Sequence, residues 1–267
     1  MTIANVLSIA GSDPSGGAGI QADLKTFGAL GCYGMAVVTA LTAQNTCGVS
    51  AVHMPPADFV AAQIDAIFAD IEVAAVKIGM LATAEIAWVV ADRLRHHRAR
   101  NIVLDPVLVA TSGDSLGAPG VVAAMRAALF PLATLVTPNL PEAARLAEAA
   151  MPDDLAGMVA CGQKMLQQGA RSVLVKGGHL KGDVARDVLV QAGMTQVFEA
   201  PRLATRNTHG TGCTLSSAIA ANLGNGMALN EAIAAAKSYL TGALQHSATL
   251  NVGHGHGPVQ HFYRSGA

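Results

Sequence analysis

The stretch NVLSIAGSDPSGGAGIQAD, residues 5–23, joins a short apolar run to a glycine-rich loop and then to a helical segment. Residues 5–11 have the composition of a buried strand, and the loop after them ends where a helix is expected to begin. A strand that leads through a loop into a helix is the repeating unit of α/β proteins. This stretch therefore predicts an α/β fold, in which the same strand–loop–helix unit recurs along the chain.

The same alternation continues along the chain. Further strand-like runs lie at residues 35–41, 74–80, 101–107, 134–140 and 172–178, and apolar spacing typical of helices covers residues 58–70, 84–97 and 118–129. Nearly continuous apolar strands are typical of sheets that are buried on both faces. We therefore expect a three-layer α/β/α architecture with a mostly parallel central sheet. No strand block is inserted between the first helix and residues 35–41, so we expect no large lid domain.

The composition is that of one globular domain. The chain has 267 residues, of which 51% are apolar and 13% charged, and no linker, low-complexity tract or repeat divides it. We therefore expect a single domain over residues 1–267. The formal net charge of −1 provides no basic surface that would follow a phosphate backbone, so we expect no nucleic-acid partner.

The cysteines and the first residues bear on the cellular compartment. Cys32, Cys47, Cys161 and Cys213 form no CxxC pair, which argues against a zinc ribbon, a redox dithiol or a disulfide scaffold. The start MTIANVLSIAGSD lacks the basic segment and the apolar run of a signal peptide, and no window is apolar for long enough to span a membrane. We expect a cytoplasmic protein with reduced thiols and no membrane partner.

Polar residues and glycines follow several of the expected strands. They are Gly11-Ser12-Asp13, Gln44-Asn45, Gly79-Met80, Asp105-Pro106, Asn139 and Lys176-Gly177. Any one of them could be an ordinary loop residue. In open α/β sheets, however, ligands bind beyond the carboxyl ends of the strands, so we expect the set to converge on one crevice.

The glycine loop after the first strand satisfies the G-x-G-x-x-G/A pattern with Gly17, Gly19 and Ala22, which makes a dinucleotide-dependent oxidoreductase one hypothesis. A Rossmann unit also needs an acidic residue near the end of the second strand, to bind the ribose. Residues 24–57 contain no Asp or Glu, which argues against that fold. The GK[ST] signature of a P-loop is absent as well.

A second glycine loop lies in NTHGTGCTLSSAIAANL, residues 207–223. Gly210, Thr211 and Gly212 allow close approach to a ligand, and an apolar helix is expected to begin near Cys213. The free N–H groups and positive dipole end of such a helix form an anion-binding hole. A thiol at this place is expected to have a lowered pKa, which favours the thiolate.

Three interpretations of Cys213 remain open at this point. It could be a small buried core residue. It could be a covalent nucleophile that uses His209, four residues earlier, as its base. It could also accept a proton from a substrate hydroxyl, or orient that hydroxyl, while the glycine loop binds a phosphoryl group in transfer.

As a set, the motifs resemble a known family. HGTGC before an apolar helix is similar to the signature of ribokinase-like small-molecule kinases, in which an aspartate usually stands where Cys213 stands here. With AGSDPSGGAGIQADLKTF, TALTAQNT, KIGML, DPV, TPNLPEA and LVKGGH, the chain resembles the hydroxymethylpyrimidine/phosphomethylpyrimidine kinases of thiamine biosynthesis, from Ile9 to the terminal GHGPVQHF. The resemblance implies ATP- and Mg²⁺-dependent phosphorylation of 4-amino-5-hydroxymethyl-2-methylpyrimidine and then of its monophosphate. It also implies a homodimer.

The resemblance assigns roles on the acceptor side. Gln44 is expected to bind the aminopyrimidine ring, because an amide carries a donor and an acceptor. Asp23 is expected to meet the hydroxymethyl or phosphate end. Ala18, Met80 and Val107 are expected to form apolar walls, although Met80 and Val107 could equally be ordinary core residues.

On the donor side the resemblance implies a catalytic group and a nucleotide site. The catalytic group comprises Cys213, Gly210, Gly212 and Lys176, and the nucleotide-binding residues are Lys176, Thr211, Asn139 and Glu142. Glu142, Asn139 and Asp105 are expected to hold Mg²⁺, partly through water. Asn139 and Glu142 could instead only cap a helix, since their spacing is also that of a capping box.

Some alternatives remain. A pyridoxal or pyridoxine kinase of the same fold is the nearest rival, because its substrate is also a hydroxymethyl-bearing aromatic heterocycle; a heterocycle-binding protein without turnover is another. Residues 111–118 and 178–183 have the flexible composition of closing loops. The histidines of the terminal NVGHGHGPVQHFY are expected to belong to a loose end rather than to a metal site.

Overall fold

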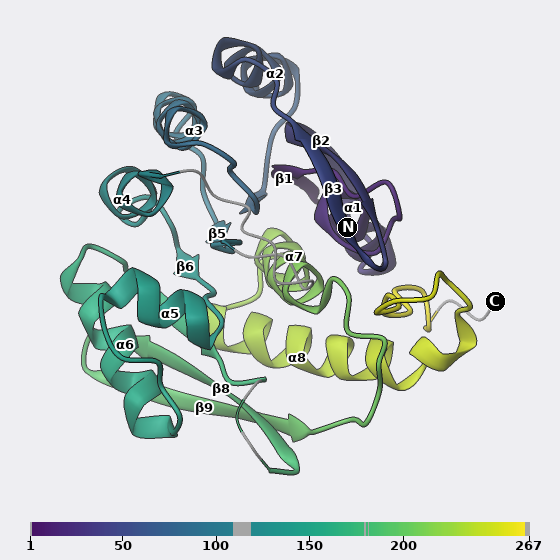
Figure 1. Cartoon of the computed structure of the whole chain (residues 1–267). Helices are drawn as coiled ribbons and strands as arrows, with labels where there is room; N and C mark the ends of the chain where they lie inside the picture. Colours follow the sequence, from purple (N-terminus) through teal and green to yellow (C-terminus); the bar gives the residue numbers. More distant parts are fainter. Residues whose placement is uncertain (1, 109–118, 179, 181, 265–267) are drawn as a thin grey trace.

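A computed structural model describes residues 2–108, 119–178, 180 and 182–264. These residues form one nine-stranded sheet in the order β3-β2-β1-β4-β5-β6-β7-β8-β9 (Figure 1). The strands are β1 (Asn5–Gly11), β2 (Tyr33–Asn45), β3 (Gly48–His53), β4 (Ala75–Ile78), β5 (Ile102–Leu104), β6 (Leu135–Val136), β7 (Ser172–Lys176), β8 (Val184–Gln191) and β9 (Met194–Pro201). The strands from β2 to β7 pair in parallel, apart from the hairpin of β2 with β3.

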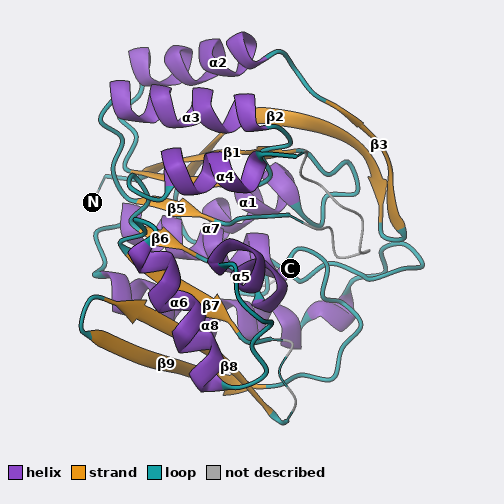
Figure 2. Cartoon of the chain, turned by 60° about the vertical axis from the view of Figure 1, so that its left-hand side comes forward, coloured by secondary structure: helices purple, strands orange, loops and turns teal. Residues whose placement is uncertain are grey.

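Helices cover both faces of the sheet (Figures 1 and 2). One face carries α2 (Ala57–Asp70), α3 (Ala84–His96), α4 (Val121–Ala124) with the π-helical turn Met125–Leu129, α5 (Leu140–Ala147) and α6 (Leu155–Gln167). The other face carries α1 (Gly19–Ala29), α7 (Thr211–Gly224) and α8 (Leu229–Gln245), and a 3₁₀ turn follows at Ser247–Thr249. The predicted three-layer α/β/α architecture is therefore confirmed.

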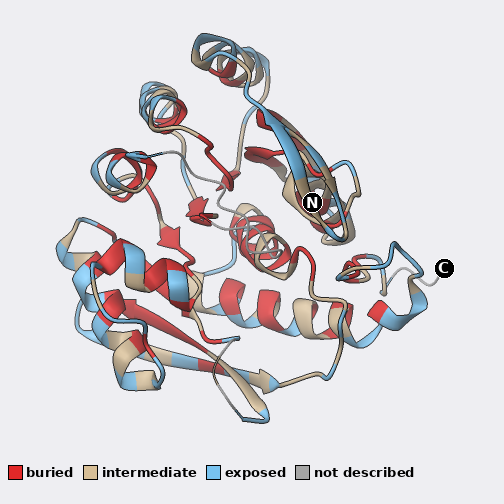
Figure 3. Ribbon diagram, viewed as in Figure 1, coloured by how far each residue is buried: buried red, intermediate tan, exposed pale blue. Residues whose placement is uncertain are grey.

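Burial explains why the chain takes this form. Every residue of β4 is buried, as is every residue of β1 after Asn5, because helices pack on both faces of the central strands (Figure 3). Helix α7 lies against β1, β4 and β5, and each residue from Thr214 to Leu223 is buried. The small side chains in TLSSAIAANL let this helix pack closely on the sheet. Its N-terminus is thereby fixed beneath the crevice at the carboxyl ends of the strands.

Three strands are additions to the predicted set. The β3 strand pairs antiparallel with the far half of β2, where the exposed and partly buried residues alternate. The strands β8 and β9 form an antiparallel hairpin against β7. Alternation in a half-exposed strand is a weaker signal than an apolar run, so the sequence predicts the central strands but not these edges.

The C-terminal segment is tied to the domain, so the expectation of a loose end is wrong. The backbone N–H of His256 donates to the Thr46 carbonyl at 3.1 Å, and that of Gln260 donates to Ala243 at 3.0 Å. The His261 side chain is buried and bonds to Thr214 Oγ1 at 3.1 Å. The segment thus packs beside the start of α7.

Candidate active site

A cavity of about 740 Å³ lies beyond the carboxyl ends of the parallel strands. It begins beside the boundary between β1 and β4, where the strand order changes direction, which is the place at which open α/β sheets bind ligands. Its lining comes from the loop after β1, the ends of β2, β4, β5 and β7, and the N-terminus of α7. Each of the strand ends expected to converge on one crevice contributes at least one residue to this lining, whereas Asn45, Gly79, Pro106 and Gly177 are not part of it.

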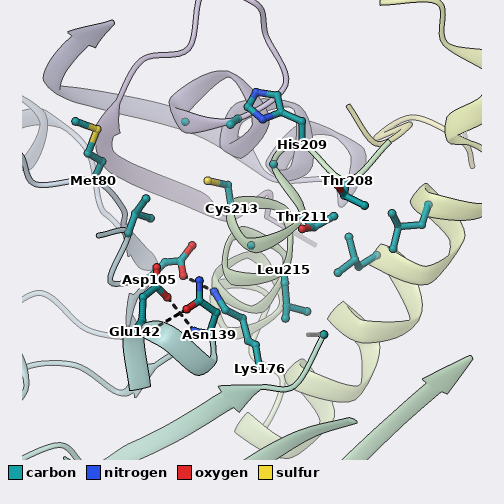
Figure 4. A pocket seen from close by; sticks show the side chains of 18 of the residues that line it. Met80, Asp105, Asn139, Glu142, Lys176, Thr208, His209, Thr211, Cys213 and Leu215 are labelled. Atoms are coloured by element: carbon teal, nitrogen blue, oxygen red, sulfur yellow. Dashed lines mark hydrogen bonds and ion pairs between the residues drawn. The ribbon is translucent and has the colours of Figure 1, made fainter. Parts of the chain in front are cut away.

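Most of the predicted site residues line this cavity. They are Ala18, Gln44, Met80, Asp105, Val107, Asn139, Glu142, Lys176, Gly210, Thr211, Gly212 and Cys213. Figure 4 shows Cys213 at the start of α7, between His209 on one side and the group of Asp105, Asn139, Glu142 and Lys176 on the other. The predicted residue that does not line the cavity is Asp23.

The start of α7 has the geometry of an anion hole. Gly210 is the N-cap residue and has φ +76, in the left-handed region that glycine adopts at no steric cost. A Cβ at this position would also collide with the Gly17 carbonyl oxygen of the first glycine loop. Glycine has no side chain to cap the helix, and the N–H of Thr211 donates to the Thr208 carbonyl at 3.3 Å. The N–H groups of Gly212 and Cys213, in the same first turn, are therefore the ones that suit an anion in the cavity.

The thiol of Cys213 does not have the lowered pKa that the sequence analysis predicted. Burial raises the pKa to about 11, and the Asp23 and Asp105 carboxylates add to that effect. The Lys77 ammonium acts in the opposite direction and is outweighed. The expectation of a ready thiolate was wrong, because desolvation outweighs the Lys77 ammonium and the hydrogen bond from the Gly19 backbone.

His209 is engaged elsewhere and does not serve Cys213. Its Nε2 lies 2.7 Å from Oδ2 of Asp13, and both side chains are buried. Although burial opposes its charge, hydrogen bonds from His209 and Ser15 lower the pKa of Asp13 to about 2. The structure therefore gives no support to the interpretation of Cys213 and His209 as a nucleophile with its base.

The end of the cavity beside β2 and β4 is an apolar slot with one amide. Met80 packs with Ala40 and Ala82 in a small cluster of its own, and Val107 lies against it. Gln44 follows a β-bulge near the end of β2, and its Oε1 accepts a hydrogen bond from Thr42 at 3.2 Å. Met80 and Val107 are thus cavity walls, separate from the two large core clusters.

At the other end, Lys176 and Asp105 form an ion pair. Lys176 Nζ lies 2.7 Å from Asp105 Oδ1, and the Thr137 and Ser216 hydroxyls donate to the same carboxylate, each at 3.2 Å. Burial opposes the charge on Asp105, yet Lys176 and Lys77 hold its pKa below the ordinary range. Burial likewise opposes the charge on Lys176, and Asp105 raises its pKa. The pair is therefore charged at neutral pH.

Asn139 and Glu142 form the capping box that the sequence analysis left as an alternative. Asn139 Oδ1 accepts from the Glu142 backbone N–H at 2.9 Å, and Glu142 Oε2 accepts from the Asn139 N–H at 2.8 Å. Burial and the nearby Asp105 charge raise the pKa of Glu142 to about 7, although Lys176 opposes them. Glu142 is therefore a buried carboxyl that titrates near neutrality.

Asp23 supports the floor of the cavity from below. Its side chain has no exposure and accepts hydrogen bonds from Lys77 at 2.8 Å and 2.9 Å, and from Ser8 and Ser217 at 2.6 Å each. Since these partners occupy both carboxylate oxygens, the structure does not place Asp23 where it could meet a substrate. The predicted contact is replaced by an ion pair between α1 and β4.

The comparisons with known proteins decide the family. Residues 13–260 match the family model described as phosphomethylpyrimidine kinase. The chain belongs to the phosphomethylpyrimidine kinase family. A hydroxymethylpyrimidine/phosphomethylpyrimidine kinase of Rhizobium meliloti (strain 1021) is 54% identical to it over 258 residues, which is 97% of each chain.

Two solved structures place this family member among kinases of the ribokinase-like fold. The pyridoxal kinase from Staphylococcus aureus, in complex with AMP-PCP and pyridoxal, is 33% identical with a TM-score of 0.91, covering 100% of this chain and 96% of that one. The phosphomethylpyrimidine kinase from Clostridium difficile 630 is 43% identical with a TM-score of 0.79, covering 90% of this chain and 98% of that one. The predicted fold and family are confirmed.

Three features of this family member's cavity were missed in the sequence. The Asp13–His209 pair joins residues 196 apart, so no local motif reveals it. Lys77 interrupts the apolar strand AAVKIGM, a signal that should have predicted a buried partner. The Arg202 guanidinium donates to the carbonyls of Gly178, Leu180 and Gly182, and so holds parts of the loop after β7.

Residues 111–118 of the expected closing loops lie outside the described residues, as do 179 and 181. In the part of the chain that is described, no group of three or more His, Cys, Asp or Glu side chains is arranged as a metal cluster would be. None of the helices in those residues has the length and apolarity that crossing a membrane requires.

Proposed function

We propose that the chain transfers the γ-phosphoryl group of ATP to 4-amino-5-hydroxymethyl-2-methylpyrimidine, and then to the resulting monophosphate. The observation that carries this proposal is the arrangement of a single cavity. In Figure 4 the start of α7 lies between Met80, on the apolar side of the cavity, and the charged group that includes Lys176. Gln44 lines the same cavity. An acceptor and a phosphate donor could therefore meet above Cys213.

The acceptor slot suits an aminopyrimidine. Met80 and Val107 provide apolar surface for the two faces or edges of a small ring, and Ala18 leaves room beside them. The Gln44 amide can donate to a ring nitrogen and accept from the exocyclic amino group at the same time. These contacts would direct the hydroxymethyl group toward Cys213.

The donor end suits the phosphates of ATP. Lys176 supplies a charge at neutral pH, and Thr211 and Gly212 line the cavity at the start of α7, where a helix N-terminus favours an anion. Further along the cavity, Leu240 and Leu244 of α8 offer apolar surface for a base. The residues of this chain would thereby fix the donor in line with the acceptor hydroxyl.

The residues Asp105, Asn139 and Glu142 fit a magnesium ion. They present hard oxygen donors of the kind that Mg²⁺ prefers, with space in the cavity for its water ligands. Burial and the Asp105 charge raise the pKa of Glu142 to about 7 although Lys176 lies nearby, and a divalent cation would favour the ionised form of this carboxyl. When bound, Mg²⁺ would neutralise charge on the phosphates.

The protonated Cys213 thiol suits an orienting role better than that of a strong base. Phosphoryl transfer passes through a loose transition state in which positioning and charge neutralisation matter most. The thiol can hold the acceptor hydroxyl in line, while the helix N–H groups and Lys176 stabilise charge on the transferring group.

ADP release by the purified protein tests this function. Mg·ATP is supplied with hydroxymethylpyrimidine, its monophosphate or pyridoxine, for the wild type and for Cys213→Ala. We expect turnover of both pyrimidines and a loss of about 10²-fold or more in kcat for the variant. A wild type that releases no ADP with either pyrimidine would refute the proposal.

A second candidate is phosphorylation of a vitamin B6 compound. The similarity in fold to the pyridoxal kinase from Staphylococcus aureus favours it, because that structure contains pyridoxal. Turnover of pyridoxine alone would reassign the function. A dinucleotide-dependent oxidoreductase would instead require a spectral change with a nicotinamide cofactor.

We also propose a cytoplasmic homodimer in which residues 1–267 form one domain. The continuous nine-stranded sheet supports the single domain. Leu41 and Val52, on the two strands of the β2–β3 hairpin, are exposed and offer apolar surface for a second copy. Sedimentation of the wild type as a monomer at micromolar concentration would contradict the dimer.

A further inference from the structure

The Asp13–His209 pair joins the two glycine loops of the cavity. One loop follows β1 and carries Ala18, and the other precedes α7 and carries Gly210. Both side chains are buried, and the N···O distance is 2.7 Å. The loops also touch through their backbones, since a Cβ at Gly210 would collide with the Gly17 carbonyl.

One carboxylate oxygen makes the connection. Oδ2 of Asp13 accepts from the Ala18 backbone N–H at 2.8 Å and also bonds to His209 Nε2. The other oxygen, Oδ1, accepts from both the N–H and the hydroxyl of Ser15, at 2.9 Å and 2.7 Å. Asp13 thus orders its own loop and, through the same group, holds the second loop.

The protonation of the pair follows from these contacts. The pKa of Asp13 is lowered to about 2, so its carboxylate is ionised and can only accept hydrogen bonds. His209 Nε2 must therefore carry a proton and donate it to Oδ2. Two donors, one from each loop, converge on one oxygen, and movement of either loop would break a bond to a buried charge.

His209 is fixed from behind as well. Its backbone N–H donates to the Gly257 carbonyl at 3.0 Å, and it forms a parallel bridge with Pro258. The imidazole also leaves no room for a side chain at Gly17, where a Cβ would meet the ring. The position of the imidazole is therefore determined by its surroundings and not only by Asp13.

We propose that Asp13 and His209 are positioning residues that set the separation between the acceptor loop and the anion hole. Ala18 is a wall of the acceptor slot, and Gly210 begins the helix that faces the phosphoryl group. A misplacement of about 1 Å between reacting groups can reduce the rate about 10²-fold. The pair would act on the alignment of the two substrates without touching the reacting atoms. This inference rests on the proposed kinase function.

The test compares kcat and KM for the wild type, His209→Asn and His209→Gln. A glutamine amide nitrogen can take the place of Nε2, whereas that of asparagine is too short to reach Asp13. We expect kcat to fall about 10–100-fold in His209→Asn and to recover to within about 3-fold of the wild type in His209→Gln. The KM for Mg·ATP should change less than about 3-fold, because the Lys176 end of the cavity is not altered.

Two controls separate positioning from stability. His97 bonds to Asp65 through Nε2 at 2.6 Å on the surface between α2 and α3, so His97→Asn removes a similar pair far from the cavity and should leave kcat unchanged. Thermal unfolding of each variant shows whether it is folded. Asp13→Asn combined with His209→Asn should lose little more than the worse single variant.

The outcomes are distinguishable. If the wild type phosphorylates neither pyrimidine, the proposed function fails and the positioning role falls with it. If the wild type is active and folded His209→Asn keeps its kcat, only the positioning role is refuted. Equal losses in kcat for the asparagine and glutamine variants would refute it too, since the restored hydrogen bond would then have no effect.

Discussion

Replacing Lys77 by methionine should destabilise the protein strongly, because it leaves the Asp23 carboxylate buried without its cation. Neither side chain is exposed, and Lys77 Nζ lies 2.8 Å and 2.9 Å from the two carboxylate oxygens. Removing one partner of such a pair costs about 3–5 kcal/mol. At about 2 °C per kcal/mol for a long chain, Tm should fall by about 6–10 °C.

The double variant Asp23→Asn with Lys77→Met tests the cause of that loss. It removes both charges, and the Ser8 and Ser217 hydroxyls can still bond to the asparagine amide, because a hydroxyl both donates and accepts. We therefore expect the double variant to recover most of the lost stability. The coupling between the two changes should be about 2 kcal/mol or more.

Denaturant unfolding of the wild type, both single variants and the double variant measures this coupling. Arg186→Met is the control, because Arg186 and Glu199 pair at 2.7 Å across β8 and β9 while both side chains remain partly exposed to solvent; its unfolding midpoint should change far less than that of Lys77→Met. A Lys77→Met variant as stable as the wild type would refute the reasoning. A double variant that is no more stable than the less stable of the two single variants would refute it as well.

Three further predictions follow from the site. The folded state raises the pKa of Glu142 from 4.5 to about 7, so this carboxyl contributes to stability below pH 4.5 and the contribution is lost as the pH rises through 7. In metal-free protein, Glu142→Gln should therefore reduce the fall in the free energy of unfolding over that pH range. At pH 8, iodoacetamide should modify the exposed Cys47 before Cys213, whose pKa is about 11; mass spectrometry showing the reverse order would contradict this. Arg202→Met should raise the KM for Mg·ATP by about 3–10-fold with little effect on kcat, because the variant no longer binds the carbonyls of Gly178 and Leu180 in the loop after β7. An unchanged KM would contradict this role of Arg202.

The central fold could be predicted because its signals are local. A strand such as β1 is buried on both faces, so its apolar run is visible in the sequence, and the glycine loop after it marks the start of α1. The helices expected at residues 58–70 and 84–97 are found at Ala57–Asp70 and Ala84–His96 for the same reason. In each case, periodicity over a few residues decides the element.

The charge pairs could not be predicted because they are not local. Asp23 and Lys77 are 54 residues apart, and the sequence does not show which strand passes beneath α1. An aspartate near the start of a helix and beside a glycine loop is typical of a substrate-binding residue. Only the parallel pairing of β1 with β4 brings Lys77 to Asp23. The prediction of a lowered pKa for Cys213 was wrong for the same reason, since burial and neighbouring charges depend on the tertiary structure.

The charges around the start of α7 give a physical reason for a thiol at position 213. Lys77 and Lys176 are each already paired with a carboxylate, Asp23 and Asp105 respectively. Among these groups, a third carboxylate at position 213 would leave a net negative charge beside a cavity that, by our proposal, must take up a nucleotide and an acceptor that is itself a phosphate. A thiol whose pKa is about 11 adds no charge at neutral pH. The positive end of α7 then remains available to the phosphoryl group, and the cost of replacing Cys213 by Asp should be greater for the monophosphate than for the alcohol.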